Sequence, residues 1–357
     1  MTGITPFPRL IRCPICADEF PWSHDPIISV WDDEKRDYLH IDTSSWSAEK
    51  RADLAQRGYR QCPNPSGDTQ EEHYLPATFG DFGDPMVIGL VGGGASGKTH
   101  LLTAMIRQAY LNGLAPYDIT VKALDHRRHR SFREKFIEEF ERGAALAGTD
   151  TGISDAADIL LLRGPAGVRP ITFFDVAGED LRDIDARNRS TRFLIGATAV
   201  IFVHPCDDRG PDGQVIRRTE NLAFDLAVER LRSKRLPAVV AVTKADRLRY
   251  APPVERWLRR GDETSVDADR IRAESRDVYA FLHHSGAGGS LEPYQAFPRC
   301  TLHFVSASGG EAAKGAAAGK NVFPRGFHPT RVLEPLVSIL AMTGMITGPE
   351  AERVGMP

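Results

Sequence analysis

Short apolar runs alternate with polar, glycine-bearing or proline-bearing segments along most of this chain beyond residue 84. The first run, Met86–Val91, has the length of a buried strand and passes directly into a glycine-rich turn. Apolar residues at helical spacing follow the turn: Leu101, Leu102, Met105 and Ile106. The pattern therefore predicts a buried strand, a tight loop and a helix in immediate succession.

Further apolar runs of strand length predict the rest of a sheet. The expected strands are residues 119–124, 159–162, 171–174, 197–204, 238–242 and 302–305. The expected helices between and after them are residues 132–147, 215–232, 268–284 and 332–346. Strands that alternate with helices are typical of an α/β fold, with a mostly parallel sheet and helices on both faces.

One connection in this series is too short for a parallel pair of strands. The runs at 159–162 and 171–174 are joined through Gly164-Pro-Ala-Gly167. A parallel crossover needs a dozen residues or more. We therefore expect an antiparallel hairpin here, and a mixed sheet with one antiparallel edge strand.

Residues 1–84 differ in character from the rest of the chain. Pro, Trp, Asp and His are common in this segment, and long apolar periods are few. We therefore expect a small N-terminal module over residues 1–84, a large α/β domain over residues 85–346, and a short C-terminal tail over residues 347–357.

Composition and charge narrow the classes of function. The 357 residues are 41% hydrophobic and 26% charged, as in an ordinary globular protein, and the net charge is −3. This charge gives no indication of a nucleic-acid or membrane surface. No basic and then apolar leader opens the sequence, and the most apolar helix candidate, residues 332–346, is too short to span a bilayer. We expect a cytosolic protein without a transmembrane segment.

The glycine-rich turn has the phosphate-loop pattern Gly92-x-x-x-x-Gly97-Lys98-Thr99, placed between a strand and a helix as that pattern requires. Glycines let successive backbone N–H groups point at an anion, and the helix adds the positive end of its dipole. Lys98 is expected to reach the β- and γ-phosphates, and the Thr99 hydroxyl to bind Mg²⁺. The predicted phosphate-binding residues are Gly92, Gly93, Gly94, Ala95, Ser96, Gly97, Lys98, Thr99 and His100.

A second motif follows the apolar run at 171–174. Asp175 stands at the carboxyl end of this run, where an aspartate can orient Mg²⁺ through water. Gly178, three residues later, is small enough for its backbone N–H to approach a γ-phosphate. The pair is common by chance, and its value comes from its place after a strand and downstream of the phosphate loop.

The next motif, Thr243-Lys244-x-Asp246, also follows an apolar run. A carboxylate at Asp246 can accept hydrogen bonds from the N1–H and exocyclic amine of guanine, while the stem of Lys244 lies along the base. Adenine has no such donor pair, and a site of this kind can reject a mismatched ligand by roughly 10⁴–10⁵-fold. After the last apolar run, Ser306 and Ala307 are expected to offer backbone N–H groups to the guanine O6.

Together these four motifs resemble those of the Ras-like and translation-factor class of phosphate-loop GTPases, over about residues 85–346. Two further features resemble bacterial proteins described as double-GTPase-like: the cysteine-bearing segment before the phosphate loop, and the sequence Asp-Val-Ala-Gly-Glu-Asp at 175–180. The resemblance implies GTP hydrolysis with Mg²⁺, in which water attacks the γ-phosphate, within a regulatory switch or an assembly element. It also implies a protein partner, such as an activating protein that supplies an arginine. Within the chain, Arg182 and Arg187 are candidates for that role, with solvated arginines of a switch region as the alternative.

The chain departs from that class beside the expected γ-phosphate. Glu179, which we place with Lys98 and Gly178 among the catalytic candidates, stands where a water-orienting Gln or His is usual. Thr149 and Thr151 are both candidates for the effector-loop threonine that binds Mg²⁺. A carboxylate next to a γ-phosphate is repulsive, so hydrolysis is expected to be slow or differently organised. A nucleotide-loaded scaffold with little hydrolysis therefore stays open.

A phosphate-loop kinase or ATPase is the other alternative. Such an enzyme would carry the loop at Gly92–Thr99 but would not need the guanine motif at 243–246.

The N-terminal cysteines have the spacing of a metal site. Cys13-Pro-Ile-Cys16 precedes Cys62, and in a reducing compartment such spacing favours a metal over a disulfide. Tetrahedral zinc needs a fourth ligand, for which His73 is the first candidate. Further candidates are His24 and His40. We expect a structural zinc site in a zinc-ribbon-like module, with free buried thiols or a redox pair as the alternatives.

Overall fold

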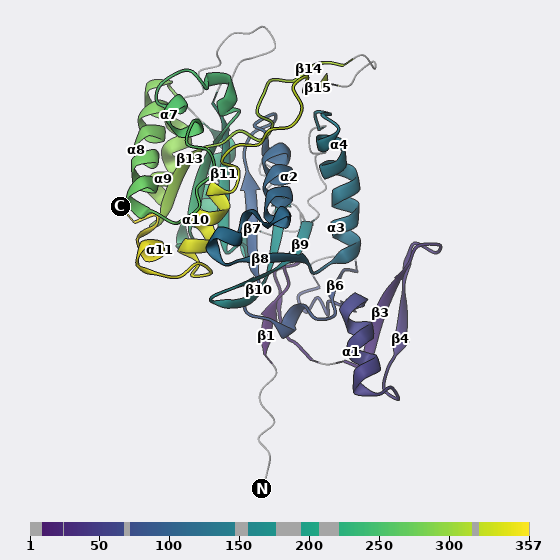
Figure 1. Ribbon diagram of the computed structural model, residues 1–357. Helices are drawn as coiled ribbons and strands as arrows, with labels where there is room; N and C mark the ends of the chain where they lie inside the picture. The colour runs from purple at the N-terminus through teal and green to yellow at the C-terminus, as the bar shows by residue number, and fades with distance from the viewer. Residues whose placement is uncertain are drawn as a thin grey trace.

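A seven-stranded sheet forms the centre of the protein (Figure 1). The computed structural model describes residues 9–23, 25–67, 72–146, 156–175, 194–206, 221–315 and 321–356. In spatial order the strands are β13 (Cys300–Phe304), β12 (Ala238–Thr243), β11 (Ala199–Pro205), β7 (Met86–Val91), β10 (Gly167–Asp175), β9 (Ala156–Gly164) and β8 (Thr120–Ala123).

The sheet is mixed and mostly parallel, which confirms the predicted fold class. The strands from β13 to β10 run parallel, and β9 is antiparallel to both of its neighbours. The predicted hairpin is present, with Gly167 in the positive-φ region at its turn. The predicted position of the antiparallel strand is wrong, because β9 does not lie at the edge. Its outer backbone groups need partners, and β8 supplies them.

Helices cover both faces of the sheet because its central strands are apolar on both sides. Along β7, Ile88 and Leu90 join one core while Val87 and Val91 join the other, as the two-residue period of a strand requires. The first core is covered by α2 (Lys98–Gln108), α3 (His126–Phe132), α4 (Glu138–Glu141) and α10 (Glu334–Met342). The second is covered by α6 (Leu222–Leu231), α7 (Val254–Leu258), α9 (Glu292–Ala296) and much of α8 (Ala268–His284).

Short 3-10 and π-helical segments complete the helical parts of the fold. They are η1 (Phe79–Asp81), η2 (Ala109–Gly113), η3 (Ala115–Tyr117), η4 (Arg133–Ile137), η6 (Arg232–Lys234), η7 (Ala245–Leu248) and η8 (Gly288–Leu291). The helix predicted at 132–147 begins earlier, because the Asp125 side chain caps it by accepting from the Arg128 N–H. It ends at Glu141, just before Gly143 adopts a positive φ. No helix in the described parts of the chain is long and apolar enough to cross a membrane.

The N-terminal segment is more regular than its composition suggests. A hairpin of β1 (Leu10–Arg12) and β2 (Glu19–Pro21) stands beside a four-stranded sheet in the order β4-β3-β5-β6, on which α1 (Ala48–Arg57) packs. The strands of this sheet are β3 (Ile27–Asp32), β4 (Asp37–Asp42), β5 (Tyr59–Gln61) and β6 (Tyr74–Pro76). Figure 1 shows the β3–β4 hairpin at the lower right, away from the central sheet.

This segment shares a hydrophobic core with the large sheet. Ile15, Phe20 and Phe79 from the N-terminal side pack in one cluster with Leu124 and Ile159 from the β8–β9 side. The cluster also contains the cysteines at 13, 16 and 62. The N-terminal segment is thus packed against the antiparallel end of the central sheet.

The last residues of the chain are docked on the sheet. The short helix α11 (Pro349–Arg353) buries Ala351, and Val354 behind it is fully buried. The Arg299 guanidinium, just before β13, donates to the carbonyl oxygens of Met342, Ala351, Glu352 and Val354. The Cys300 N–H donates to the Gly355 carbonyl at 3.2 Å. The C-terminal residues therefore lie beside the edge strand β13.

A segment that follows β13 crosses toward α4. We call its described parts, residues 309–315 and 321–323, the strap. Within it β14 (Ala313–Lys314) pairs with β15 (Asn321–Val322). Backbone hydrogen bonds join the strap to the end of α4: Ala145 N–H to Asn321 O at 2.9 Å, and Phe323 N–H to Gly143 O at 2.7 Å. Part of the Gly- and Ala-rich run at 309–319 is thus paired in a short antiparallel ladder.

Candidate functional site

The loop between β7 and α2 needs small residues for two physical reasons. Gly97, directly before α2, has φ +90°, a region that favours glycine. A Cβ on Gly92 would stand 2.4 Å from the Val203 carbonyl oxygen, so β11 leaves no room for a side chain there. The loop curls around its lysine: Lys98 Nζ donates to the Gly92 and Gly93 carbonyls at 2.8 and 3.1 Å.

The Thr99 hydroxyl meets the aspartate that ends β10. It donates to Asp175 Oδ2 at 2.6 Å. The contact follows from topology, because β7 and β10 are parallel neighbours whose carboxyl ends lie at the same edge of the sheet. The other residues predicted on this side are Gly178, Glu179, Thr149, Thr151, Arg182 and Arg187, and they lie outside the described residues.

A second group of predicted residues follows β12 and β13. Lys244, at φ +56°, turns back over the phosphate loop and donates to the Ala95 carbonyl at 2.7 Å. The Thr243 hydroxyl donates to the Ser96 carbonyl at 2.5 Å. Asp246 is buried, and its Oδ1 accepts a hydrogen bond from the Ser306 hydroxyl at 2.5 Å. These contacts join the phosphate loop and the two later motifs into one structure.

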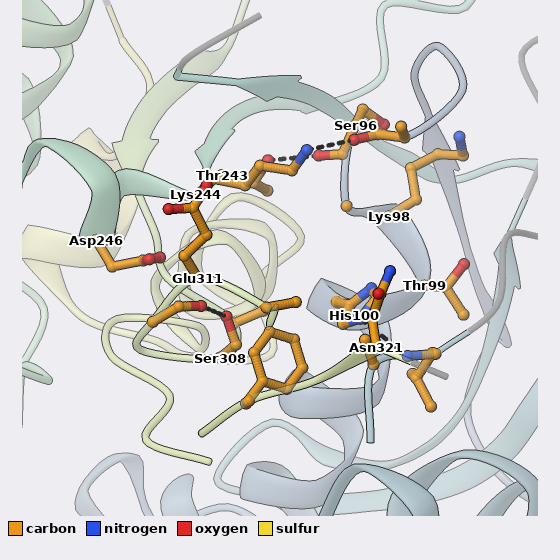
Figure 2. A pocket seen from close by; sticks show the side chains of 18 of the residues that line it. Ser96, Lys98, Thr99, His100, Thr243, Lys244, Asp246, Ser308, Glu311 and Asn321 are labelled. Carbon is orange, nitrogen blue, oxygen red and sulfur yellow. Dashed lines mark hydrogen bonds between the residues drawn. The ribbon is translucent and has the colours of Figure 1, made fainter. Parts of the chain in front are cut away.

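A single cavity of about 560 Å³ joins these groups. Lys98 and Thr99 lie at one end, and Asp246, Ala307 and Ser308 lie at the other. In Figure 2 Asp246 stands on the left of the cavity and Thr99 on the right, with His100 between them. A volume of this size lies in the range of small-molecule sites. The sheet reverses its strand order at β7, and open α/β sheets bind ligands at such a point.

The cavity is also lined by residues that the sequence motifs did not identify. Among them are Ala145 and Leu146 after α4, and Asn321 and Phe323 from the strap. Asn321 and Phe323 come directly after a Gly- and Ala-rich run without periodicity, so no local pattern marks them as part of the site. His100, predicted as part of the phosphate loop, also lines the cavity with its side chain.

The N-terminal cysteines and one histidine come together in a separate place. The donor atoms of Cys13, Cys16, Cys62 and His73 all lie within 4.8 Å of one another, and all four residues are buried. Cys13 and Cys16 sit in the β1–β2 turn, while the backbone bond from Cys62 N–H to His73 O closes the loop between β5 and β6. His40 instead contacts the Ser29 hydroxyl, and His24 lies outside the described residues.

The spacing of this cluster suits a tetrahedral metal. Tetrahedral sulfur ligands at about 2.3 Å from zinc stand about 3.8 Å apart. The Cys16 and Cys62 sulfurs are 3.7 Å apart, and Cys13 Sγ is 3.3 Å from His73 Nε2. Three sulfurs and one imidazole nitrogen are a common donor set of closed zinc sites.

Comparison with known proteins gives matches among solved structures only. No protein-family model and no curated protein matches the chain. The bacterial selenocysteine-specific elongation factor EF-Sec matches at 16% identity and a TM-score of 0.27, over 62% of this chain and 26% of that one. The signal recognition particle receptor SRb-GTP/SRX complex from Chaetomium thermophilum matches at 14% identity and a TM-score of 0.28, over 66% of this chain and 95% of that one. Sup35 complexed with GDP matches at 16% identity and a TM-score of 0.25, over 63% of this chain and 38% of that one.

These likenesses are too distant to carry an argument. The chain spans about a quarter of the length of the elongation factor that it matches. The fold class therefore rests on the chain's own features, which are a mixed, mostly parallel α/β sheet and a glycine-rich loop of the phosphate-binding pattern at its switch point.

Proposed function

We propose that the protein binds guanine nucleotide with Mg²⁺ and hydrolyses GTP to GDP and phosphate, as a regulatory switch or an assembly element. The observation that carries this proposal is the cavity with Lys98 at one end and the buried Asp246 carboxylate at the other. A cation that suits phosphate and an acceptor that suits guanine line the same space.

The phosphate end suits a nucleotide with its metal. Lys98 is buried and held by two loop carbonyls, so its ammonium is positioned before a phosphate arrives. The oxygens of Thr99 and Asp175 stand 2.6 Å apart and are hard ligands of the kind that Mg²⁺ prefers, directly or through water. When bound, Mg²⁺ would neutralise charge that develops on the phosphate oxygens.

The base end suits guanine. The Ser306 hydroxyl holds one oxygen of Asp246 and orients the carboxylate toward the cavity that Asp246 lines. This carboxylate would accept the N1–H and exocyclic amine of guanine. Lys244 reaches across to the phosphate loop, so its aliphatic stem lies where a base face would rest.

The rate of GTP hydrolysis depends, in this proposal, on the residues expected beside the γ-phosphate. We propose that the Gly178 N–H senses the γ-phosphate and that Thr149 or Thr151 contributes to the metal. Glu179 would disfavour water attack by its charge, so we expect slow intrinsic hydrolysis that an activating protein raises. The same carboxylate favours a second candidate, a nucleotide-loaded scaffold that hydrolyses little. Single-turnover GTP hydrolysis with and without cell extract separates the two functions.

The decisive test of the proposed site is nucleotide preference. Calorimetric titration of the full chain with GDP and with ADP, each with Mg²⁺, should show strong preference for GDP. Equal affinities for GDP and ADP would contradict the role proposed for Asp246 and would favour a phosphate-loop kinase or ATPase.

We also propose that the four-residue cluster holds one structural Zn²⁺ through Cys13, Cys16, Cys62 and His73. The donor set and its spacing support this proposal. A site with four protein ligands is closed, so we expect stability rather than catalysis from it.

A further inference from the structure

His100 follows the phosphate-loop threonine, and its ring is fixed in place by aromatic neighbours. The ring stands edge-on to Phe140 of α4 at 5.2 Å and to Phe323 of the strap at 5.8 Å. Both phenylalanines are buried. The imidazole is therefore held between two elements that are far apart in sequence, and one part of it lines the cavity (Figure 2).

A backbone contact determines which nitrogen carries the proton. The Leu146 N–H donates to His100 Nε2 at 3.2 Å. A backbone N–H can only donate, so Nε2 must be unprotonated, and the neutral ring carries its proton on Nδ1. Nδ1 has no hydrogen-bond partner among the described residues. The ring thus offers one N–H donor with no acceptor in the parts of the chain that the structure describes.

The charge state of the ring follows from the same contact. A doubly protonated imidazolium has no acceptor nitrogen, so a ring that accepts from the Leu146 N–H is neutral and its donor is an uncharged N–H.

The position of His100 along the cavity indicates what accepts from that donor. The phosphate end is marked by Lys98 and the base end by Asp246. A nucleotide that spans these two ends places its sugar in the middle, where His100 and Asn321 line the wall. Ribose hydroxyl oxygens accept as well as donate, so they match a single imidazole N–H beside a side-chain amide.

We propose that His100 is a specificity residue for the sugar, donating from Nδ1 to a ribose hydroxyl of the bound nucleotide. This inference rests on the proposed function. It assigns a ribonucleotide preference to a side chain that the phosphate-loop pattern leaves free to vary. The strap takes part indirectly, because Phe323 and the backbone at 143–145 hold the ring and its Leu146 partner in place.

The test uses two variants that each keep one half of the imidazole. His100→Gln places an acceptor near the position of Nε2 and has no donor at Nδ1, whereas His100→Asn places a donor near Nδ1 and loses the contact to Leu146. Calorimetry of the full chain measures the dissociation constants for GDP, 2′-deoxy-GDP and 3′-deoxy-GDP. A neutral hydrogen bond corresponds to about a three- to tenfold change in affinity.

We expect the parent protein to bind one of the two deoxynucleotides about three- to tenfold more weakly than GDP. His100→Gln should bind GDP and that deoxynucleotide equally, and His100→Asn should keep the parent's ratio. Two results would overturn the inference: a parent ratio of one for both deoxynucleotides, or a His100→Gln ratio equal to the parent's. The second includes a uniform loss of affinity in His100→Gln, which would place the acceptor outside the sugar. Absence of any GDP binding by the parent would be a failure of the proposed function itself.

Discussion

At the scale of single residues, the role proposed for Asp246 in choosing the base is testable because of its environment. The carboxylate is buried and already accepts one hydrogen bond from Ser306. A base without matching donors would leave a buried charge with its remaining acceptor positions empty, which is costly.

Asp246→Asn should shift preference from guanine toward xanthine nucleotides. The amide offers a donor where xanthine presents a carbonyl oxygen, and it no longer accepts both guanine protons. Competition between GDP and XDP measures the shift. Asp53→Asn, on the exposed surface of α1, is the matched control and should leave the preference unchanged. Parent-like preference in Asp246→Asn would contradict the assignment.

Substitutions of Lys98 and Thr99 should affect different properties: the affinity for nucleotide and the dependence of binding on Mg²⁺. Lys98→Ala removes a charge-assisted contact, worth about 1.5–3 kcal/mol, and should weaken GDP binding by tenfold or more. Thr99→Ala should mainly weaken the Mg²⁺ dependence of binding, while Thr99→Ser keeps the hydroxyl that meets Asp175 and should resemble the parent. Titrations with and without Mg²⁺ provide the measurement. Parent rates of GTP hydrolysis in both alanine variants would show that the site is wrongly placed.

His100 should make the nucleotide-free protein sensitive to acid. Its pKa is lowered to about 4 in the folded state, below the ordinary value near 6.5. The folded state therefore disfavours protonation, so this stability is fully present above about pH 6.5 and is lost as the pH falls toward 4. Between pH 7 and pH 5 the loss is about 2 kcal/mol. Urea unfolding of parent and His100→Gln at the two pH values should show a smaller loss in the variant, and equal losses would count against a buried neutral ring.

At the scale of elements, the cysteine cluster depends on two hairpin-like connections that are distant in sequence. The β1–β2 turn brings Cys13 and Cys16, and the β5–β6 connection brings Cys62 and His73. Neither connection can hold the cluster alone, so a bound metal would cross-link the segment.

Cys13→Ser should lower zinc content from about one per chain and loosen the N-terminal segment. Elemental analysis and thiol titration of purified protein measure the metal and the free sulfurs. Cys300→Ser is the control, because Cys300 is buried in β13 outside the cluster. A parent protein with much less than one zinc per chain, and with three freely titrating thiols in this segment, would leave Cys13, Cys16 and Cys62 as ordinary buried cysteines.

The central elements could be predicted from sequence because each has a local cause. Met86–Val91 is apolar on both sides, and α8 shows clear helical periodicity over Ala268–His284, so both were predicted with the bounds observed. The four-stranded N-terminal sheet was missed, since β5 and β6 are short and β4 is largely exposed. Strand order escaped prediction where it depends on pairing: β8 covers β9 because of hydrogen bonds that no local pattern encodes.

The residues of the candidate site likewise fall into those that the sequence predicts and those that it does not. Lys98, Thr99, Lys244 and Asp246 belong to motifs with fixed spacing, and the structure places all of them around one cavity. Phe323 and Leu146 reach it only through tertiary contacts between the strap and the end of α4. Their positions depend on chain geometry, so composition and periodicity give no signal for them.

At the scale of the whole molecule, Arg299 connects the carboxyl-terminal residues to the sheet. Its guanidinium donates to carbonyls at the ends of α10 and α11, where the last turn of a helix leaves backbone acceptors to be satisfied from outside. Arg299→Leu should remove these hydrogen bonds and make the last residues sensitive to carboxypeptidase. Arg353→Leu, which loses only exposed ion pairs, is the control. Equal resistance of both variants would show that the guanidinium does not hold the terminus.

The docking of the carboxyl terminus also has a consequence for how copies of this chain meet. β13 is the last strand of the sheet on its side, and an open strand edge is a template on which another polypeptide can add a strand. Here the Gly355 carbonyl already occupies the Cys300 N–H, and the residues around Val354 are buried beside it. Residue 355 thus blocks strand addition at the start of β13, while the Ser275 and Glu274 side chains of α8 accept from the Leu302 and Phe304 N–H groups further along, and both contacts favour solubility of the folded chain.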